Sequence, residues 1–151
     1  MTIRRATVAD APDIGRLLHD FNTEFSDPTP GAAALAERAA KFIEDGTLTF
    51  LLAGEGPYGI AQMRYVLSIW SGELDAYLEE LYVVPELRGK GIGRALLETA
   101  METARAAGAT HMDLNTGETD TAARALYESA GFTNREGSED GPSMLYYERD
   151  L

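Results

Sequence analysis

A run of glycine and basic residues near the middle of the chain has the residue types and spacing of a phosphate-binding loop. Its members are consecutive: Arg88, Gly89, Lys90, Gly91, Ile92, Gly93 and Arg94. The apolar periodicity that begins at Ile92 predicts a helix over residues 91–107, and a helix start leaves backbone N–H groups without intrahelical acceptors. Those groups attract anions, and glycine lets a phosphate approach without obstruction from a Cβ. The run therefore predicts a phosphate site, although a tight turn without a ligand would have the same composition.

Two common nucleotide-binding fingerprints do not fit this run. A dinucleotide fingerprint needs a third glycine where Arg94 stands, and it follows the first strand of a domain. A Walker loop needs serine or threonine after its lysine, but Gly91 follows Lys90. The phosphate is therefore expected to belong to a different kind of ligand.

The elements around this run are predicted to form a mixed sheet with helices on its faces. Consecutive strands with short turns are expected to pair antiparallel, whereas the strands on either side of the helix over residues 91–107 are expected to be parallel. The predicted strands are residues 2–5, 49–53, 58–67, 75–84, 111–115, 132–136 and 144–149. The predicted helices are one capped at Thr7, then residues 32–43, 91–107 and 120–130. The order β-α-α-β-β-β-α-β-α-β-β predicts an α/β fold, and 151 residues suit a single domain over residues 1–151.

Composition narrows the classes of site that the chain can hold. It has no cysteine and only 2 histidines, which excludes thiolate chemistry and disfavours a histidine metal site, so no metal is expected. A formal net charge of −12 disfavours nucleic-acid binding, which needs clustered lysine and arginine. No apolar stretch approaches the roughly 20 residues that cross a bilayer, and no signal peptide is recognisable. These features predict a soluble, cytoplasmic protein that binds neither nucleic acid nor membrane.

The chain resembles the GNAT superfamily of N-acetyltransferases. Residues 88–93 satisfy its hallmark, Q/R-x-x-G-x-G/A at the start of the long helix, and the strand before them is similar to the family's donor-binding strand. A second signature, A-x-x-L-Y-x-x-x-G-F, is matched by Ala123, Leu126, Tyr127, Gly131 and Phe132. The predicted order of elements is similar to the family fold over the whole chain, including a central pair of strands that splay apart.

The resemblance implies acetyl-CoA as the acyl donor. Its pyrophosphate would lie on the backbone N–H groups of residues 89–93. The cations Arg88, Lys90 and Arg94 would either neutralise the phosphates or stay solvated, and Arg94 has Glu98 four residues on as an alternative partner.

Further donor contacts follow from the same resemblance. The pantetheine arm would pair like an added strand with Tyr82, Val83 and Val84. Family members often have asparagine where this chain has Asp120, and an aspartate is no equivalent beside a polyanionic donor. Asp120 is therefore expected to act as a helix cap, and Asn115 is the alternative donor contact.

Candidate catalytic residues are Glu79, Glu80 and Tyr127. A lysine-like amine has a pKa near 10.4, so neutralising it at pH 7 costs roughly 4–5 kcal/mol, part of which a general base recovers. Alternation along the strand is expected to send Glu79 and Glu80 to opposite faces, with Glu80 favoured as the base. The resemblance gives Tyr127 the role of protonating the leaving thiolate, although packing in an apolar helical face is the alternative.

These inferences predict an acetyl-CoA-dependent N-acetyltransferase acting on a primary amine of a small molecule, peptide or protein. The alternative is a non-catalytic acyl-CoA-binding sensor or scaffold, since the glycine run fits both. The sequence does not separate acetyl from longer acyl donors, and it does not specify the acceptor. The oligomeric state is open, although dimers are common in the family.

Overall fold

The computed structural model describes residues 1–151, which fall into two compact units. The first unit, Met1–Leu114, contains a five-stranded sheet and the helices that cover it. The second unit, Asn115–Leu151, contains one further helix and the C-terminal segment. The mixed α/β architecture predicted from the sequence is confirmed.

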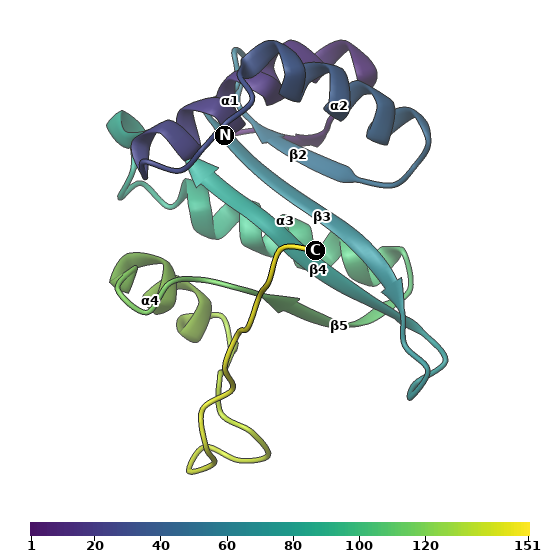
Figure 1. The fold of residues 1–151 in the computed structure, drawn as a ribbon, viewed down its shortest axis with the longest axis vertical. Coiled ribbons are helices and arrows are strands. Elements are labelled where there is room, and N and C mark those ends of the chain that lie inside the picture. The colour runs from purple at the N-terminus through teal and green to yellow at the C-terminus, as the bar shows by residue number, and fades with distance from the viewer. The chain divides into compact units, whose positions relative to one another are not determined.

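The sheet of the first unit has the strand order β1-β2-β3-β4-β5 (Figure 1). Its strands are β1 Ile3–Arg5, β2 Thr49–Ala53, β3 Gly59–Leu67, β4 Leu74–Val83 and β5 Ala109–Leu114. The strands β1 to β4 pair antiparallel in chain order. The last pair, β4 with β5, is parallel because helix α3, Ile92–Ala106, crosses back along the sheet between them. Both kinds of pairing are those that the sequence predicts.

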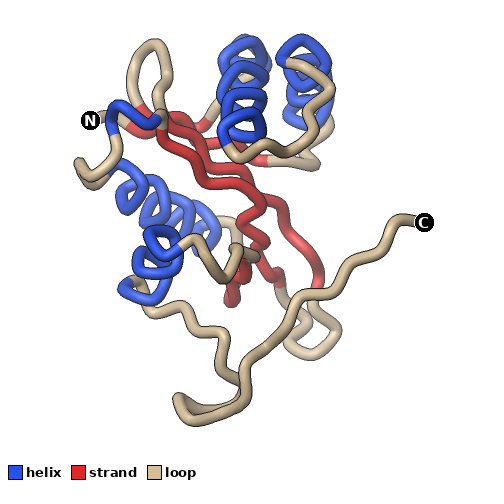
Figure 2. The backbone as a smooth tube through the Cα atoms, turned by 60° about the vertical axis from the view of Figure 1, so that its left-hand side comes forward, coloured by secondary structure: helices blue, strands red, loops and turns tan.

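Helices cover both faces of this sheet (Figure 2). Helices α1, Ala11–Glu24, and α2, Ala32–Glu44, lie on one face, and α3 lies on the other. Every residue of β2 is buried, because its side chains point alternately toward the helices on the two faces of the sheet. Phe50 and Leu52 belong to the core cluster under α1 and α2, together with Ile14, Leu17 and Ile60.

Helices α1 and α2 approach each other closely at Gly15. A Cβ at this position would lie 2.8 Å from the Ala36 backbone nitrogen and would collide with the Ala32 carbonyl oxygen. No larger residue fits without moving one helix, so Gly15 fixes how α1 lies on α2. Because α1 also contacts β3 and β4, this packing sets where its C-terminal residue, Glu24, stands over the sheet.

The second unit contains helix α4, Thr121–Ser129. Its N-cap is Asp120, whose Oδ1 accepts a hydrogen bond of 3.1 Å from the Ala123 N–H, as the sequence predicts. The two strands predicted after α4 are wrong: neither residues 132–136 nor residues 144–149 form a strand, and this region has one isolated antiparallel bridge, between Arg135 and Ser143. Neither segment has a longer ladder, and a two-stranded hairpin alone is marginal in water.

The remaining element boundaries agree with the predictions to within a few residues. The largest local difference is at Thr7, where a short 3-10 helix, η1 Val8–Asp10, precedes α1. The Thr7 N–H donates to Asp10 Oδ2 at 2.7 Å, so the predicted cap exists, although it caps the short helix. None of the helices combines the length and apolar character that crossing a bilayer requires.

Candidate active site

The predicted phosphate-binding loop joins β4 to α3 through a second short helix, η2 Pro85–Leu87. Gly89 and Gly91 both have left-handed backbone conformations, with φ of 76° and 82°, which side-chain-bearing residues rarely adopt. A Cβ at either glycine would meet no atom within 4 Å, so the glycines leave open space beside the backbone. The conformation and the open space both suit a loop whose backbone receives an anion.

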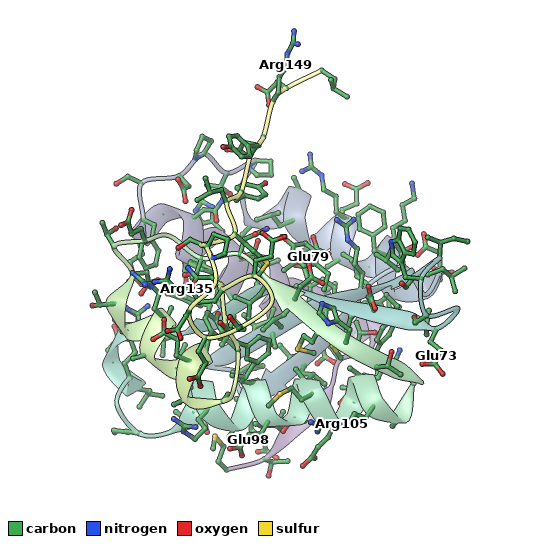
Figure 3. All side chains as sticks on the ribbon, turned by 90° about the horizontal axis from the view of Figure 1, so that it is seen from below. Glu73, Glu79, Glu98, Arg105, Arg135 and Arg149 are labelled. Atoms are coloured by element: carbon green, nitrogen blue, oxygen red, sulfur yellow. The ribbon has the colours of Figure 1, made fainter.

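The packing of the apolar side of α3 fixes the orientation of its N-terminus. Gly91 is the N-cap residue, and no side chain caps the helix, so no side-chain oxygen competes for its first N–H groups. Ile92, Leu96 and Leu97 are buried against the sheet. Glu98 and Arg105 point from the opposite side of α3, away from the sheet (Figure 3). A buried stripe thus holds the helix start in place, and the residues present fit the pyrophosphate of an acyl-CoA donor.

The cations of the loop differ in their surroundings. Lys90 and Arg94 are exposed on the loop and the first turn of α3. The guanidinium of Arg88 turns back toward the sheet, where Nε donates to the Val83 carbonyl oxygen at 2.9 Å and both terminal nitrogens donate to Glu24. The predicted contact of Arg88 with phosphate therefore competes with an ion pair inside the chain.

The two neighbours of β4 accompany it over different lengths. The ladder with β3 extends to the pair of Gly59 with Val83, whereas the ladder with β5 ends at the pair of Leu78 with Leu114. Residues 79–83 of β4 therefore have no β5 partner along that edge. This divergence matches the predicted splay of the central strands, and it provides the edge on which an extended donor could pair.

The register identifies which backbone groups point to that edge. The Val84 N–H donates to the Tyr58 carbonyl oxygen at 2.9 Å, and alternation makes Tyr82 and Ile60 the next hydrogen-bonded pair between β3 and β4. The backbone groups of Leu81 and Val83 then point toward β5. Of the predicted contacts Tyr82, Val83 and Val84, only Val83 thus has its backbone toward the open edge. Leu81, which the sequence did not indicate, joins it.

A β-bulge interrupts β4 at the two candidate glutamates. Gln62 pairs with Glu80 and Met63 pairs with Leu78, so Glu79 is the extra residue. The register then places both carboxylates on the face covered by α1. The expectation that Glu79 and Glu80 face opposite sides is therefore wrong, because simple alternation holds only in a strand without a bulge.

Glu79 is held by a cation on the neighbouring strand. Arg64 Nε on β3 lies 3.3 Å from Glu79 Oε1, and the Arg64 guanidinium also lies over the Tyr77 ring, 5.6 Å from its centroid. Oε1 itself is buried and makes no hydrogen bond, so the contact is an ion pair without hydrogen-bond geometry. Figure 3 shows Glu79 along β4, beyond Glu73 near the β3–β4 hairpin.

Glu80 has acidic rather than basic neighbours. Burial raises the pKa of its carboxyl group to about 7, and the negative charges of Glu79 and Asp27 act in the same direction. Asp27 comes from the connection between α1 and α2, so the charges that raise this pKa come from two segments of the fold, β4 and that connection. A carboxylate with such a pKa is partly ionised at neutral pH, which suits a general base.

The model of the acetyltransferase (GNAT) family matches residues 14–132. The chain belongs to this family. It is 30% identical over 141 residues to aminoglycoside N(6')-acetyltransferase type 1 of Stenotrophomonas maltophilia, covering 89% of this chain and 88% of that protein.

Two further GNAT relatives bear on the fold. Mycothiol acetyltransferase of Beutenbergia cavernae is 33% identical over 114 residues; the match covers 72% of this chain but only 37% of that longer protein. A solved structure from Arthrobacter sp. FB24, which carries an acetyltransferase name without an acceptor, is 42% identical with a TM-score of 0.91. It covers 100% of this chain and 96% of that chain. The predicted fold and enzyme class, an N-acetyltransferase of the GNAT type, are confirmed.

The second GNAT signature lies in the second unit. Tyr127 is half-buried in α4, and its ring packs edge-on against Phe132, with centroids 6.0 Å apart. The Phe132 N–H donates to the Tyr127 carbonyl oxygen at 3.0 Å, which explains locally why the signature pairs these two aromatic residues. Asn115 is the first residue of this unit. The roles of Tyr127 and Asn115 stay predictions.

Sequence reasoning missed several residues that surround the glutamates and the loop. Arg64, Asp27 and Glu24 carry the charges that act on Glu79, Glu80 and Arg88. Each is an ordinary charged residue far along the chain from its partner, so no local spacing identifies it. Leu81 was missed because the direction of its backbone groups depends on the register with β3.

Proposed function

We propose that this chain transfers an acetyl group from acetyl-CoA to a primary amine by direct attack of the amine on the thioester, with Glu80 as the base. The observation that carries the proposal is Glu80 itself. Its carboxyl group lies on the part of β4 that β5 no longer accompanies, and burial among acidic neighbours raises its pKa to about 7.

Family membership and the loop geometry support acetyl-CoA as the donor. The positive φ angles of Gly89 and Gly91 and the uncapped start of α3 leave backbone N–H groups for the pyrophosphate. Lys90 and Arg94 add positive charge beside them. The N–H groups of Leu81 and Val83 would pair with the donor arm, or would receive the negative charge that develops on the thioester oxygen.

The acceptor amine must lose a proton before or during its attack. An amine with a pKa near 10.4 is almost wholly protonated at pH 7, at a cost of roughly 4–5 kcal/mol to neutralise. Glu80 would take that proton directly or through one water molecule. Glu79, held by Arg64, would instead keep a negative charge beside Glu80 and so maintain its raised pKa.

The resemblance supports Tyr127 as the residue that protonates the leaving thiolate. A primary amine is the proposed acceptor class, in keeping with the family and with the aminoglycoside acetyltransferase noted above. The net charge of −12 would favour the approach of a cationic amine.

Thermal unfolding with and without acetyl-CoA is the first test. A donor at 100 times its Kd stabilises the folded state by about 2.7 kcal/mol, which raises the Tm by several degrees in a domain of this size. Amines that raise the Tm further then enter an assay of CoA release. Donor stabilisation with amine-dependent CoA release supports the proposal. Donor stabilisation without CoA release from any amine would instead favour a non-catalytic acyl-CoA sensor, and no stabilisation would refute the donor site.

A further inference from the structure

The side chain of Arg88, the first residue of the GNAT hallmark, is directed away from the loop that it begins. Its Nε donates to the Val83 carbonyl oxygen at 2.9 Å. Its terminal nitrogens donate to the two carboxylate oxygens of Glu24 at 2.7 and 2.8 Å. This is a bidentate ion pair, the geometry in which arginine fixes orientation as well as charge.

Glu24 is the last residue of α1, and it also receives a contact from β4. The Tyr82 hydroxyl donates to Glu24 Oε1 at 3.3 Å, and the Arg88 guanidinium lies 5.5 Å from the centroid of the Tyr82 ring. Tyr82 is 5% exposed, and its ring stacks on Phe21 of α1 at 4.9 Å. The carboxylate therefore joins three segments: the end of α1, the end of β4 and the start of the predicted phosphate-binding loop. This loop, residues 88–93, is called the donor loop below.

This connection matters because the loop is open on the side where side chains at its glycines would stand. A Cβ at Gly89 or Gly91 would meet nothing within 4 Å, so no side chain of these two residues anchors the loop. On one side the loop is held by the buried stripe of α3. On the other side its nearest anchored side chain is that of Arg88, and Glu24 fixes the orientation of that side chain.

We propose that Glu24 is a positioning residue for the acyl donor, which acts through Arg88 to hold the donor loop against the open edge of β4. The inference rests on the proposed function, because it assumes that acetyl-CoA binds this loop. The Arg88 hydrogen bonds lower the pKa of Glu24, so its carboxylate is ionised throughout the neutral range. The side chains of Arg88 and Glu24 are 42% and 28% exposed, and an ion pair with this exposure contributes little to stability by itself.

The same contact joins the donor loop to the acceptor side of the site. Beyond Glu24 the chain continues through Phe25 and Ser26 to Asp27, whose charge acts on Glu80. A donor that orders the loop would thereby also order the segment that carries Asp27. We therefore expect loss of Glu24 to weaken donor binding directly. It should weaken binding of the amine only through this coupling.

The test compares Glu24→Gln and Arg88→Gln, singly and together, with wild type in a steady-state assay of CoA release. We expect Glu24→Gln to raise the KM for acetyl-CoA by about three- to fivefold, the effect of losing a partly exposed ion pair, with a much smaller change in kcat. If Glu24 acts through Arg88, the double variant will be no worse than Arg88→Gln alone. Glu24→Asp keeps the charge and should recover part of the donor affinity.

A matched control is Arg4→Gln, which removes the bidentate pair at the opposite, N-terminal end of α1, where Arg4 donates to Asp10 at 2.8 and 2.7 Å. It should leave the KM for acetyl-CoA at the wild-type value. Donor-induced Tm shifts provide a second measurement that does not require turnover. An unchanged donor KM and Tm shift in Glu24→Gln would overturn the inference, as would additive effects in the double variant. Absence of a donor shift in wild type would instead overturn the proposed function.

Discussion

Arg64 Nε on β3 lies 3.3 Å from Glu79 Oε1 on β4, so a cation accompanies one of two consecutive glutamates that the β-bulge places on one face of the sheet. The charges that act on the other glutamate, Glu80, are both negative and belong to Glu79 and Asp27. Two identical side chains, adjacent in sequence, thus have opposite electrostatic surroundings. Unequal surroundings of this kind give paired carboxyl groups different roles at active sites.

Replacing Glu80 by glutamine should remove most of the turnover while leaving donor binding intact. The amide has nearly the same shape but accepts no proton, and general bases contribute typically 10² to 10⁴ in rate, so we expect kcat to fall by about 10²–10³. The Tm shift with acetyl-CoA should stay at its wild-type size. Glu79→Gln is the matched control, with a much smaller effect on kcat. A Glu79→Gln variant that loses more activity than Glu80→Gln would reverse the assignment.

The pH dependence of catalysis should follow Glu80. A base must be deprotonated to act, so kcat/KM is expected to rise with pH through an apparent pKa near 7. The charge of Glu79 raises the Glu80 pKa, so Glu79→Gln should shift this acidic limb to lower pH. Glu73→Gln, which removes an equal charge from an exposed residue just before β4, serves as the control and should leave the limb in place. Identical profiles for all three proteins would show that another group controls the limb.

Much of the fold was predictable because it depends on local patterns. Apolar periodicity marked α1 and α3, and glycines and prolines marked the ends of α2 and the turns between strands. The last two predicted strands failed because an apolar and aromatic run such as residues 144–147 shows only that a segment can form a strand. A ladder also requires a partner, and the structure provides one bridge, from Arg135 to Ser143.

The candidate site was predictable only where its function depends on consecutive residues. The glycine run has a recognisable spacing because backbone groups within one turn bind the ligand. The bulge at Glu79 depends on how β4 aligns with Gln62 and Met63, and no pattern within β4 reveals it. The ion pair of Arg88 with Glu24 likewise joins residues separated by the whole of α2 and three strands, so only the folded structure shows it.

The raised pKa of Glu80 should also appear in the pH dependence of stability. A carboxyl group whose pKa rises from 4.5 to about 7 on folding binds its proton more tightly in the folded state. Its stabilising effect is complete below pH 4.5 and is lost as the pH rises through 7. The free energy of unfolding of Glu80→Gln relative to wild type should therefore increase by about 3 kcal/mol between pH 4.5 and 8. Urea unfolding of both proteins at the two pH values measures this, and an unchanged difference would contradict burial of Glu80.

Substitution of Gly91 by alanine should weaken donor binding by straining the loop. Its φ of 82° is unfavourable for a residue with a Cβ, at a cost of roughly 1–2 kcal/mol, and the Cβ would enter the open space where we place the pyrophosphate. Gly108→Ala is a close control, because Gly108 has a φ of 96° and equally open surroundings but follows the other end of α3. Both variants should lose similar stability, whereas only Gly91→Ala should lose the Tm shift with acetyl-CoA. Loss of the shift in both, or in neither, would mean that the conformation at Gly91 has no specific role in holding the donor.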